Sequence, residues 1–251
     1  MIKASIKKRE EIKLMREGGK ILASIVRKMA DETKPGISTM YLEEIATRLL
    51  KSMDVISPFK GYDGYKFNSC LSLNNVVVHG EPSSKVILKE GDLLKIDLGV
   101  NLRGMITDHA ITVIVGDKTT PTREKLVACS KMALMSAIKP LKAGEDLANI
   151  TYRINDTAEV FGFSPVRELV GHGVGYQLHE DPNISCYRGH ALRMDLKEGM
   201  TFAIEAMINE GSWKCASVKG SSDIVTMDGK DSATFEHTVV INKDGFEILT
   251  I

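Results

Sequence analysis

The stretch that decides the fold is Leu93–Val115, LLKIDLGVNLRGMITDHAITVIV, in which two apolar runs flank a short polar turn. Both runs are short and largely apolar, so with the turn between them they predict two antiparallel strands. Each run carries one aspartate, although aspartate is depleted in strands and a buried ionised carboxylate is costly without a partner. With the turn centred on Asn101–Gly104, the spacing predicts that Asp97 lies directly opposite Asp108, where like charges destabilise a hairpin unless a cation separates them.

Two further acids repeat this pattern in the second half of the chain. Glu205 lies in the apolar run Thr201–Ile208, and Glu236 lies in Ala233–Val240. Four strand carboxylates carry four negative charges, which two divalent cations would neutralise. Such a pair of ions, roughly 3.5–4 Å apart, can hold and activate a bridging hydroxide. The acids therefore predict a dinuclear metal site.

The six histidines divide into candidates for the site and structural residues. His172 and His179 lie in the glycine-rich run Gly171–Pro182, where glycine permits close backbone approach. His172 is a candidate nitrogen ligand, and His179 a candidate group facing the substrate. His79 ends a strand-like run and enters a loop, a favourable place for a catalytic side chain. The others are expected to be structural or exposed: His109, His237 and His190.

Hydrophobic periodicity predicts an α+β chain of two similar halves. Each half has two helices separated by a break, followed by a loop and antiparallel strands. The breaks at Gly36 and Gly144 are 108 residues apart. We expect one catalytic domain over 1–251, with pseudo-repeat halves of about 1–116 and 117–251 and a site between them. The predicted helices are 7–32, a segment after Ser38 or Thr39, 121–139 and 147–161; the predicted strands are 70–73, 76–78, 93–100, 106–115, 200–209, 224–227 and 234–241.

Composition excludes several classes of protein. The chain has 251 residues, with 33 Lys and Arg against 33 Asp and Glu, so it lacks the broad positive field of a nonspecific nucleic-acid binder. No apolar run is long enough to span a membrane, and the N-terminus lacks the apolar stretch of a secretory signal. The four cysteines form no CxxC pair, which predicts reduced thiols in a cytoplasmic protein.

Four segments together resemble the type I methionine aminopeptidases, a family with the creatinase-like pita-bread fold. The resemblance spans about residues 7–250 and is most specific in CLSLNNVVVHG (70–80), RELVGHGVGYQLHEDP (167–182), MTFAIEAMINEG (200–211) and SATFEHTV (232–239). It implies a curved antiparallel sheet flanked by helices, with a dinuclear metal site at its centre. The start of the chain resembles the short bacterial form, in which no extra domain precedes the first helix.

The resemblance also implies roles for individual residues. The metal ligands would be Asp97, Asp108, His172, Glu205 and Glu236. The catalytic residues would be His79, His179 and Glu205, with Glu205 moving a proton. Substrate would be bound by His79, His179, Tyr62, Tyr65, Cys70 and Leu178. A monovalent cation, Na or K, would be held by Asn74, Val76 and Ser232.

The implied reaction is removal of the N-terminal methionine from nascent polypeptides, through hydrolysis by a metal-bridging hydroxide. The two divalent ions would be Co, Mn, Fe or Zn, and an oxygen-rich ligand set favours manganese, iron or cobalt. The expected partners are nascent polypeptide N-termini with transient ribosome contact, and we expect a monomer that binds no specific nucleic acid and no membrane. The basic clusters at 7–9 and 123–125 are more typical of solvated helix ends than of a ribosome contact.

Three alternatives remain open. A proline-specific aminopeptidase or dipeptidase of the same fold would cleave X-Pro substrates instead. A non-catalytic binding protein would be expected to have lost ligands, and a chance grouping of acids would not reproduce the combined segments. Departures from the usual family pattern bear on the pocket and its substrate preference, and not on hydrolysis: they are Asp63, His109, Leu178, Ala206 and Ser222.

Overall fold

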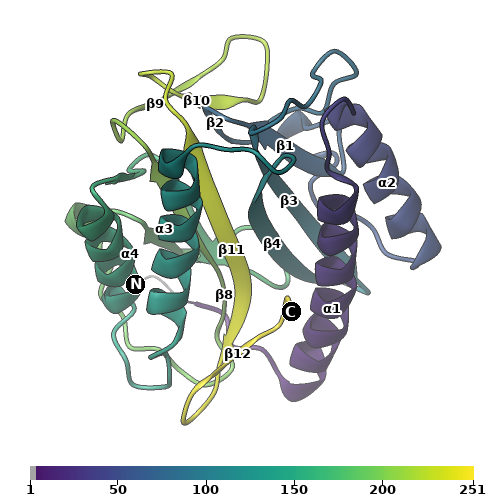
Figure 1. Cartoon of the computed structure of the whole chain (residues 1–251). Coiled ribbons are helices and arrows are strands. Elements are labelled where there is room, and N and C mark those ends of the chain that lie inside the picture. The colour runs from purple at the N-terminus through teal and green to yellow at the C-terminus, as the bar shows by residue number, and fades with distance from the viewer. Residues whose placement is uncertain (1–3) are drawn as a thin grey trace.

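The computed structural model describes residues 4–251, and it contains four long helices and one large sheet (Figure 1). The helices are α1 (Arg9–Glu32), α2 (Thr39–Ser52), α3 (Pro121–Ile138) and α4 (Ala148–Phe161), with short 3₁₀ turns η1 (Tyr62–Gly64) and η2 (Arg188–His190). The strands are β1 (Ser69–Leu73), β2 (Val76–Val78), β3 (Leu93–Leu102), β4 (Met105–Ile114), β5 (Ser164–Pro165), β6 (Val170–Gly173), β7 (Glu180–Ser185), β8 (Thr201–Asn209), β9 (Cys215–Ser217), β10 (Ile224–Thr226), β11 (Ser232–Ile241) and β12 (Phe246–Ile248).

The large sheet is antiparallel and draws strands from both halves of the chain. Its main path runs β1-β3-β4-β11-β8-β6-β7, with β12 paired to β11 and β5 paired to β8. A smaller sheet of order β2-β10-β9 also joins the two halves, since β2 pairs with β10. The β4–β11 contact is therefore the seam at which the halves meet in the large sheet.

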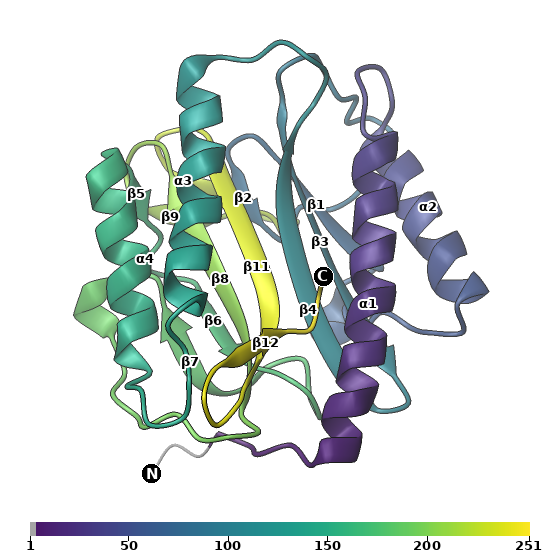
Figure 2. The same ribbon diagram turned by 60° about the horizontal axis from the view of Figure 1, so that its bottom comes forward.

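Helices cover one face of this sheet. α1 packs on β3 and β4, whereas α3 packs on β8 and β11 (Figure 2). Alternate residues of β3, namely Leu94, Ile96, Leu98 and Val100, join the core beneath α1 and α2. Because successive side chains of a strand point to opposite faces, Asp97 faces away from these helices. Within the described residues 4–251, no helix combines the length and hydrophobicity needed to cross a bilayer.

The first helix begins two residues later than predicted. It starts at Arg9, and Glu11 Oε2 accepts a 2.6 Å hydrogen bond from the Lys8 backbone N–H. Lys7 is buried and donates its backbone N–H to Gly199 O, and Ile6 forms an isolated β-bridge with Met200, so Lys7 belongs to an N-terminal arm that packs beside the start of β8. The predicted bounds of α3 and α4 agree with the structure to within one residue at each end, and α2 begins as predicted, with Ser38 as its N-cap.

The predicted pairing of Asp97 with Asp108 is wrong. The turn is the two-residue segment Arg103–Gly104, and both residues have positive φ, as a tight type I′ hairpin requires. This shorter turn shifts the register, so Asp97 pairs with Ala110 and Asp108 pairs with Gly99. The two aspartates still share a face of the sheet, and they lie as diagonal neighbours instead of directly opposite each other.

The close contact between α1 and the C-terminal segment depends on a glycine. A Cβ added at Gly19 would lie 2.1 Å from Leu249 O, whereas a Cβ at Gly18 would have its nearest neighbour, Leu102 Cβ, at 3.4 Å. Both glycines are buried in the same helix. They therefore form a matched pair: an added methyl group collides with the Leu249 carbonyl at Gly19 but has space at Gly18.

We predict that Gly19→Ala lowers the free energy of unfolding by roughly 1–3 kcal/mol, because α1 must move away from the carbonyl. Gly18→Ala should be neutral or stabilising, since alanine is favoured over glycine in a helix by up to about 1 kcal/mol. Thermal denaturation of both variants tests this. Equal stability of the two variants would contradict the packing of α1 on Leu249.

Candidate metal centre

Five neighbouring strands each place one ligand-type side chain on the face of the sheet opposite the helices. These side chains are Asp97 on β3, Asp108 on β4, Glu236 on β11, Glu205 on β8 and His172 on β6. The strands are consecutive in the sheet, in the order β3-β4-β11-β8-β6. The sheet path thus brings together all five residues that were predicted as metal ligands.

The strand registers arrange these side chains in two rows. In the first row, Asp97 pairs with Ala110, Ala110 with Glu236, and Glu236 with Glu205. In the second row, His172 pairs with Ala203, and Ala203 pairs with Thr238. Asp108 lies beside Thr238, whose hydroxyl accepts a 2.8 Å hydrogen bond from the Asp108 backbone N–H.

Three of the five side chains meet closely. One potential ligand atom from each of Asp108, His172 and Glu236 lies within 4.8 Å of the others, and all three residues are buried. Asp97 and Glu205 line the same cavity, whose volume is about 470 Å³.

Two carboxylate oxygens show that the site is electrostatically incomplete without a cation. Asp97 Oδ1 and Glu236 Oε1 are buried and have no hydrogen-bond partner within residues 4–251. A buried, unpartnered carboxylate oxygen is costly, and a bound cation removes that cost. The side chains present therefore fit divalent metal ions, which take carboxylate oxygen and imidazole nitrogen ligands.

Burial raises the pKa of all four carboxyl groups, and repulsion from neighbouring carboxylates adds to this at Asp97, Glu205 and Glu236. Burial raises the pKa of Asp108 to about 7, and burial followed by repulsion from Asp108 raises the pKa of Glu205 to about 8. For Asp97 and Glu236 the same causes, burial first, raise the pKa well above its usual range. A cation bound among these groups would reverse this preference for protons.

His172 is held ready to act as a neutral ligand. Burial lowers its pKa to about 4, so the imidazole is uncharged at neutral pH. Its Nδ1 lies 2.9 Å from Gly173 O, which favours a proton on Nδ1 and leaves Nε2 free to bind a metal. The ring of His179 lies edge-on to it, with the ring centroids 4.4 Å apart.

The other two predicted histidines lie at the rim of the cavity. His79 and His179 both line it and are solvent-exposed, unlike His172. His79 has a left-handed backbone with φ of 59°, a strained conformation that is frequent at functional sites. His179 Nδ1 lies 2.8 Å from the Tyr62 hydroxyl. Both rings are placed to reach a molecule that enters the cavity.

The residues predicted to form the substrate pocket line the same cavity. Tyr62, Tyr65, Cys70 and Leu178 all contribute to its wall. The Tyr65 hydroxyl donates to Ser69 O at 2.9 Å, and burial raises the pKa of the Cys70 thiol. Five lining residues were not identified from the sequence at all: Phe59, Val78, Ser217, Ser221 and Ile224. Asp63 and Ser222, noted in the sequence only as departures from the family pattern, line the cavity as well.

The residues predicted to hold a monovalent cation lie outside the cavity lining, where the turn after β1 meets the start of β11. Asn74 O and Ser232 O both accept hydrogen bonds from Lys95 Nζ, at 2.6 and 2.9 Å. Val76 begins β2 nearby. The amine of a lysine thus stands between two of the three residues named for the ion.

The histidines predicted to be structural are structural. His109 is buried, and its Nδ1 lies 2.6 Å from Glu236 O. Its ring stacks on His237 with centroids 4.7 Å apart. His190 is exposed in η2. His109 thereby holds the backbone of Glu236 from the opposite face of the sheet.

Comparison with known proteins now identifies the family. Residues 13–243 match the model of metallopeptidase family M24. Over 240 residues and 96% of both chains, the sequence is 43% identical to methionine aminopeptidase 1 of Bacillus subtilis. The chain belongs to the methionine aminopeptidases of family M24.

Three further comparisons place this family member among its relatives. It is 37% identical over 248 residues to the methionine aminopeptidase of Escherichia coli, covering 98% of this chain and 94% of that one. The crystal structure of methionine aminopeptidase from Thermotoga maritima superposes with a TM-score of 0.96, at 39% identity and with 99% of each chain covered. The prolidase of Pyrococcus furiosus superposes with a TM-score of 0.79 at 23% identity, and it shares the fold alone.

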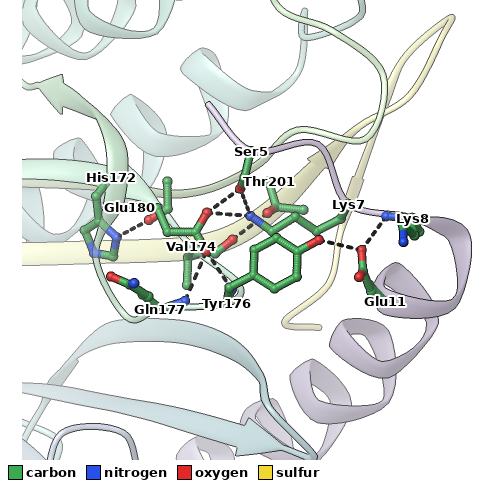
Figure 3. Close-up of polar contacts among 11 residues, drawn as sticks. Ser5, Lys7, Lys8, Glu11, His172, Val174, Tyr176, Gln177, Glu180 and Thr201 are labelled. Carbon is green, nitrogen blue, oxygen red and sulfur yellow. Dashed lines mark hydrogen bonds and ion pairs between the residues drawn. The ribbon is translucent and has the colours of Figure 1, made fainter. Parts of the chain in front are cut away.

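An interaction that the sequence did not reveal supports the loop carrying His179 (Figure 3). The Lys7 side chain is fully buried, and its Nζ lies 2.6 Å from Glu180 Oε2. Glu180 Oε1 accepts hydrogen bonds from the backbone N–H groups of Tyr176 and Gln177. The Lys7–Glu180 pair therefore joins the N-terminal arm of this metallopeptidase to the loop between β6 and β7. The expectation that residues 7–9 form a solvated helix end is wrong for Lys7.

The raised carboxyl pKa values predict how the stability of the metal-free protein depends on pH. Native Asp108 and Glu205 retain protons up to about pH 7–8, whereas unfolded carboxyls lose them near pH 4. The native state thus binds more protons in between, so the free energy of unfolding falls as pH rises through about 7–8.

We expect the melting temperature of chelator-treated protein to fall between about pH 6 and about pH 8.5, and the gain on adding Mn²⁺ to be larger at the higher pH. Thermal denaturation with and without Mn²⁺ measures both effects. Asp108→Asn removes one of the four charges and should flatten the dependence. A melting temperature of the metal-free protein that rises over this range would contradict the assigned cause.

We predict that Lys7→Met lowers the free energy of unfolding by roughly 2 kcal/mol, because it leaves the Glu180 carboxylate largely buried without its cation. Lys28→Met is the matched control, since Lys28 pairs with Glu32 on the exposed surface of α1 and such pairs contribute about 0–1 kcal/mol. Chemical denaturation compares the two variants. If both lose the same stability, the buried pair has no special role.

Proposed function

We propose that this chain removes the N-terminal methionine from nascent polypeptides, with Asp97, Asp108, His172, Glu205 and Glu236 holding two divalent metal ions. The observation that carries the proposal is the convergence of these five side chains, one from each of five adjacent strands, at one cavity. Nearly full-length similarity to methionine aminopeptidases supports the choice of reaction.

Bound divalent ions supply such a site with Lewis acidity and a nucleophilic water. Glu205 is the residue of the chain best suited to carry the proton from that water to the leaving amide nitrogen. Its pKa of about 8 in the metal-free protein shows that its surroundings favour the protonated form. A carboxyl group at the edge of the metal centre can thus accept a proton and release it within one turnover.

His179 is proposed to stabilise the oxygen of the scissile carbonyl. Desolvation lowers its pKa, which favours the neutral ring. When the Tyr62 hydroxyl donates to Nδ1, the proton of the neutral ring is on Nε2, which can donate to a substrate oxygen. His79, which also lines the cavity, is proposed to contact the substrate as well. These are pre-positioned donors of the kind that lower barriers to acyl transfer.

The methionine side chain is proposed to occupy the apolar part of the cavity. Tyr62, Tyr65, Cys70 and Leu178 provide its wall, together with Phe59. Such a wall suits a flexible, polarisable thioether. Leu178 and Ser222 stand where aromatic residues are frequent in the family, so we propose that this pocket also admits side chains similar to methionine.

Other parts of the proposal concern the ions and the setting. The oxygen-rich ligand set favours manganese, iron or cobalt over a thiolate-type zinc site. Action in the cytoplasm on chains leaving the ribosome remains a prediction, and the four free cysteines are consistent with it. A monomeric state and transient ribosome contact also remain predictions. The predicted Na or K ion is not part of this proposal, because the Lys95 amine lies between the carbonyls of Asn74 and Ser232.

The prolidase alternative has weaker support. Prolidases share the fold at 22–23% identity, and this chain covers only 63–65% of their length. The methionine enzymes match over almost the whole of both chains. A peptide bearing N-terminal methionine is therefore the favoured substrate.

Hydrolysis of the peptides Met-Ala-Ser and Ala-Pro-Ala by metal-stripped protein, with and without added Mn²⁺ or Co²⁺, tests the proposed function. We expect metal-dependent release of methionine from the first peptide and no cleavage of the second. Cleavage of the second peptide alone would assign the chain to the proline-specific branch. Methionine release by Glu205→Ala at the full rate, with metal bound, would contradict the role of Glu205.

We predict that His179→Ala lowers kcat by roughly 10²–10³-fold, because it removes a donor to the developing oxyanion. His190→Ala is the control, since His190 is exposed outside the cavity lining and should leave kcat unchanged. Metal content is measured for both variants. An unchanged kcat for His179→Ala would remove His179 from the mechanism.

A further inference from the structure

Lys95 is a fully buried lysine close to the metal centre, and it has no role in the proposed reaction. Only 2% of the residue is exposed, and it lies on β3 two residues before Asp97. Among residues 4–251, no carboxylate comes within ion-pair distance of its amine. Such burial is costly unless other polar groups compensate. The polar groups around the amine must therefore account for a lysine at this position.

Two backbone carbonyl groups provide that compensation. Lys95 Nζ donates to Asn74 O at 2.6 Å and to Ser232 O at 2.9 Å. Burial lowers the pKa of Lys95 to about 7. Both the charged and the neutral amine carry enough N–H groups for these two bonds, so the contacts hold in either form.

The two carbonyls belong to segments that lead directly to metal ligands. Asn74 lies in the turn between β1 and β2, with a left-handed φ of 48°, and its side-chain oxygen accepts from the Leu93 N–H at the start of β3. Ser232 begins β11, the strand of Glu236, and its N–H donates to Asn74 O at 3.1 Å. The Lys95 amine therefore ties together the beginnings of the strands that carry Asp97 and Glu236.

Lys95 also shares a face with the ligands. It is in the same orientation along β3 as Asp97, and it pairs with Thr112 on β4. Thr112 Oγ1 in turn donates to Thr234 O on β11 at 2.8 Å. Lys95 and Thr112 thus lie side by side next to the row of metal ligands. Each donates a hydrogen bond to a backbone carbonyl of β11 and so holds that strand to the first half of the sheet.

We propose that Lys95 is a positioning residue whose amine fills, from within the chain, the place at the Asn74 and Ser232 carbonyls where a monovalent metal ion is expected. With Nζ 2.6 and 2.9 Å from the two oxygens, an ion between them would collide with the amine. The chain therefore needs neither Na⁺ nor K⁺ to hold the beginnings of β3 and β11 together at the metal centre.

Thermal denaturation of the full chain in chelator, with the chloride salt of K⁺, Na⁺ or tetramethylammonium at equal ionic strength, tests this proposal. The wild-type melting temperature should be the same in all three salts to within about 1 °C. Lys95→Ser leaves the carbonyls facing a space that a small cation can enter. It should melt at least roughly 4 °C lower in tetramethylammonium and recover most of that loss in K⁺ or Na⁺.

Lys95→Met is the matched control, because its side chain fills the space but can neither donate to the carbonyls nor be replaced by an ion. Its loss should be independent of the salt. A wild-type protein that gains several degrees in K⁺ or Na⁺ over tetramethylammonium would overturn the proposal, as would a Lys95→Ser variant indifferent to the cation. Because the wild-type melting temperature is compared across the three salts, the proposal can be tested even if a variant fails to fold.

These stability measurements do not require peptide hydrolysis, so they can succeed or fail separately from the proposed function. Methionine release by Mn²⁺-loaded protein in the same three salts adds a second readout. Wild-type kcat/KM should be unchanged by the salt, whereas that of Lys95→Ser should fall in tetramethylammonium and recover in K⁺ or Na⁺. A salt-independent kcat/KM for Lys95→Ser would contradict a positioning role for the amine.

Discussion

Repulsion among four carboxylates on one face of a sheet is the constraint on which this structure depends. Asp97, Asp108, Glu205 and Glu236 lie together at the floor of one cavity, and two of their oxygens have no hydrogen-bond partner within residues 4–251. Without a cation, the groups respond by retaining protons, as the pKa values near 7 and 8 show. A sheet that brings these strands together is consistent with a protein that folds around, or readily takes up, divalent metal ions.

The rest of the molecule keeps that arrangement rigid. Helices bury the alternate residues of the ligand strands, so each strand is fixed in the register that points its acid toward the cavity. His109 holds the Glu236 backbone from the helix side, and Lys95 ties the starts of β3 and β11. Lys7 and Glu180 do the same for the loop that carries His179. Each contact positions a residue of the centre without lining the cavity itself.

Much of the fold and the candidate site could be predicted because the relevant signals are local. Helical spacing and the breaks at Gly36 and Gly144 predicted all four long helices, with every predicted boundary within two residues of the structure. Acids within apolar strands predicted the carboxylate groups of the site. The register of the hairpin was predicted wrongly. The sequence around Asn101–Gly104 fits a four-residue turn as well as the observed two-residue turn at Arg103–Gly104, and the choice between them changes which residue of β4 pairs with Asp97.

The sequence by itself determined which residues carry chemistry and which strands and helices they occupy, since alternation, capping and turn residues act over a few positions. Only the tertiary structure decided the strand order β3-β4-β11-β8-β6, which turns five separate side chains into one centre. It also decided that Lys7 meets Glu180 and that Lys95 meets Ser232. These partners are more than a hundred residues apart, and a lysine that the chain buries has the same local pattern as one that it exposes to water.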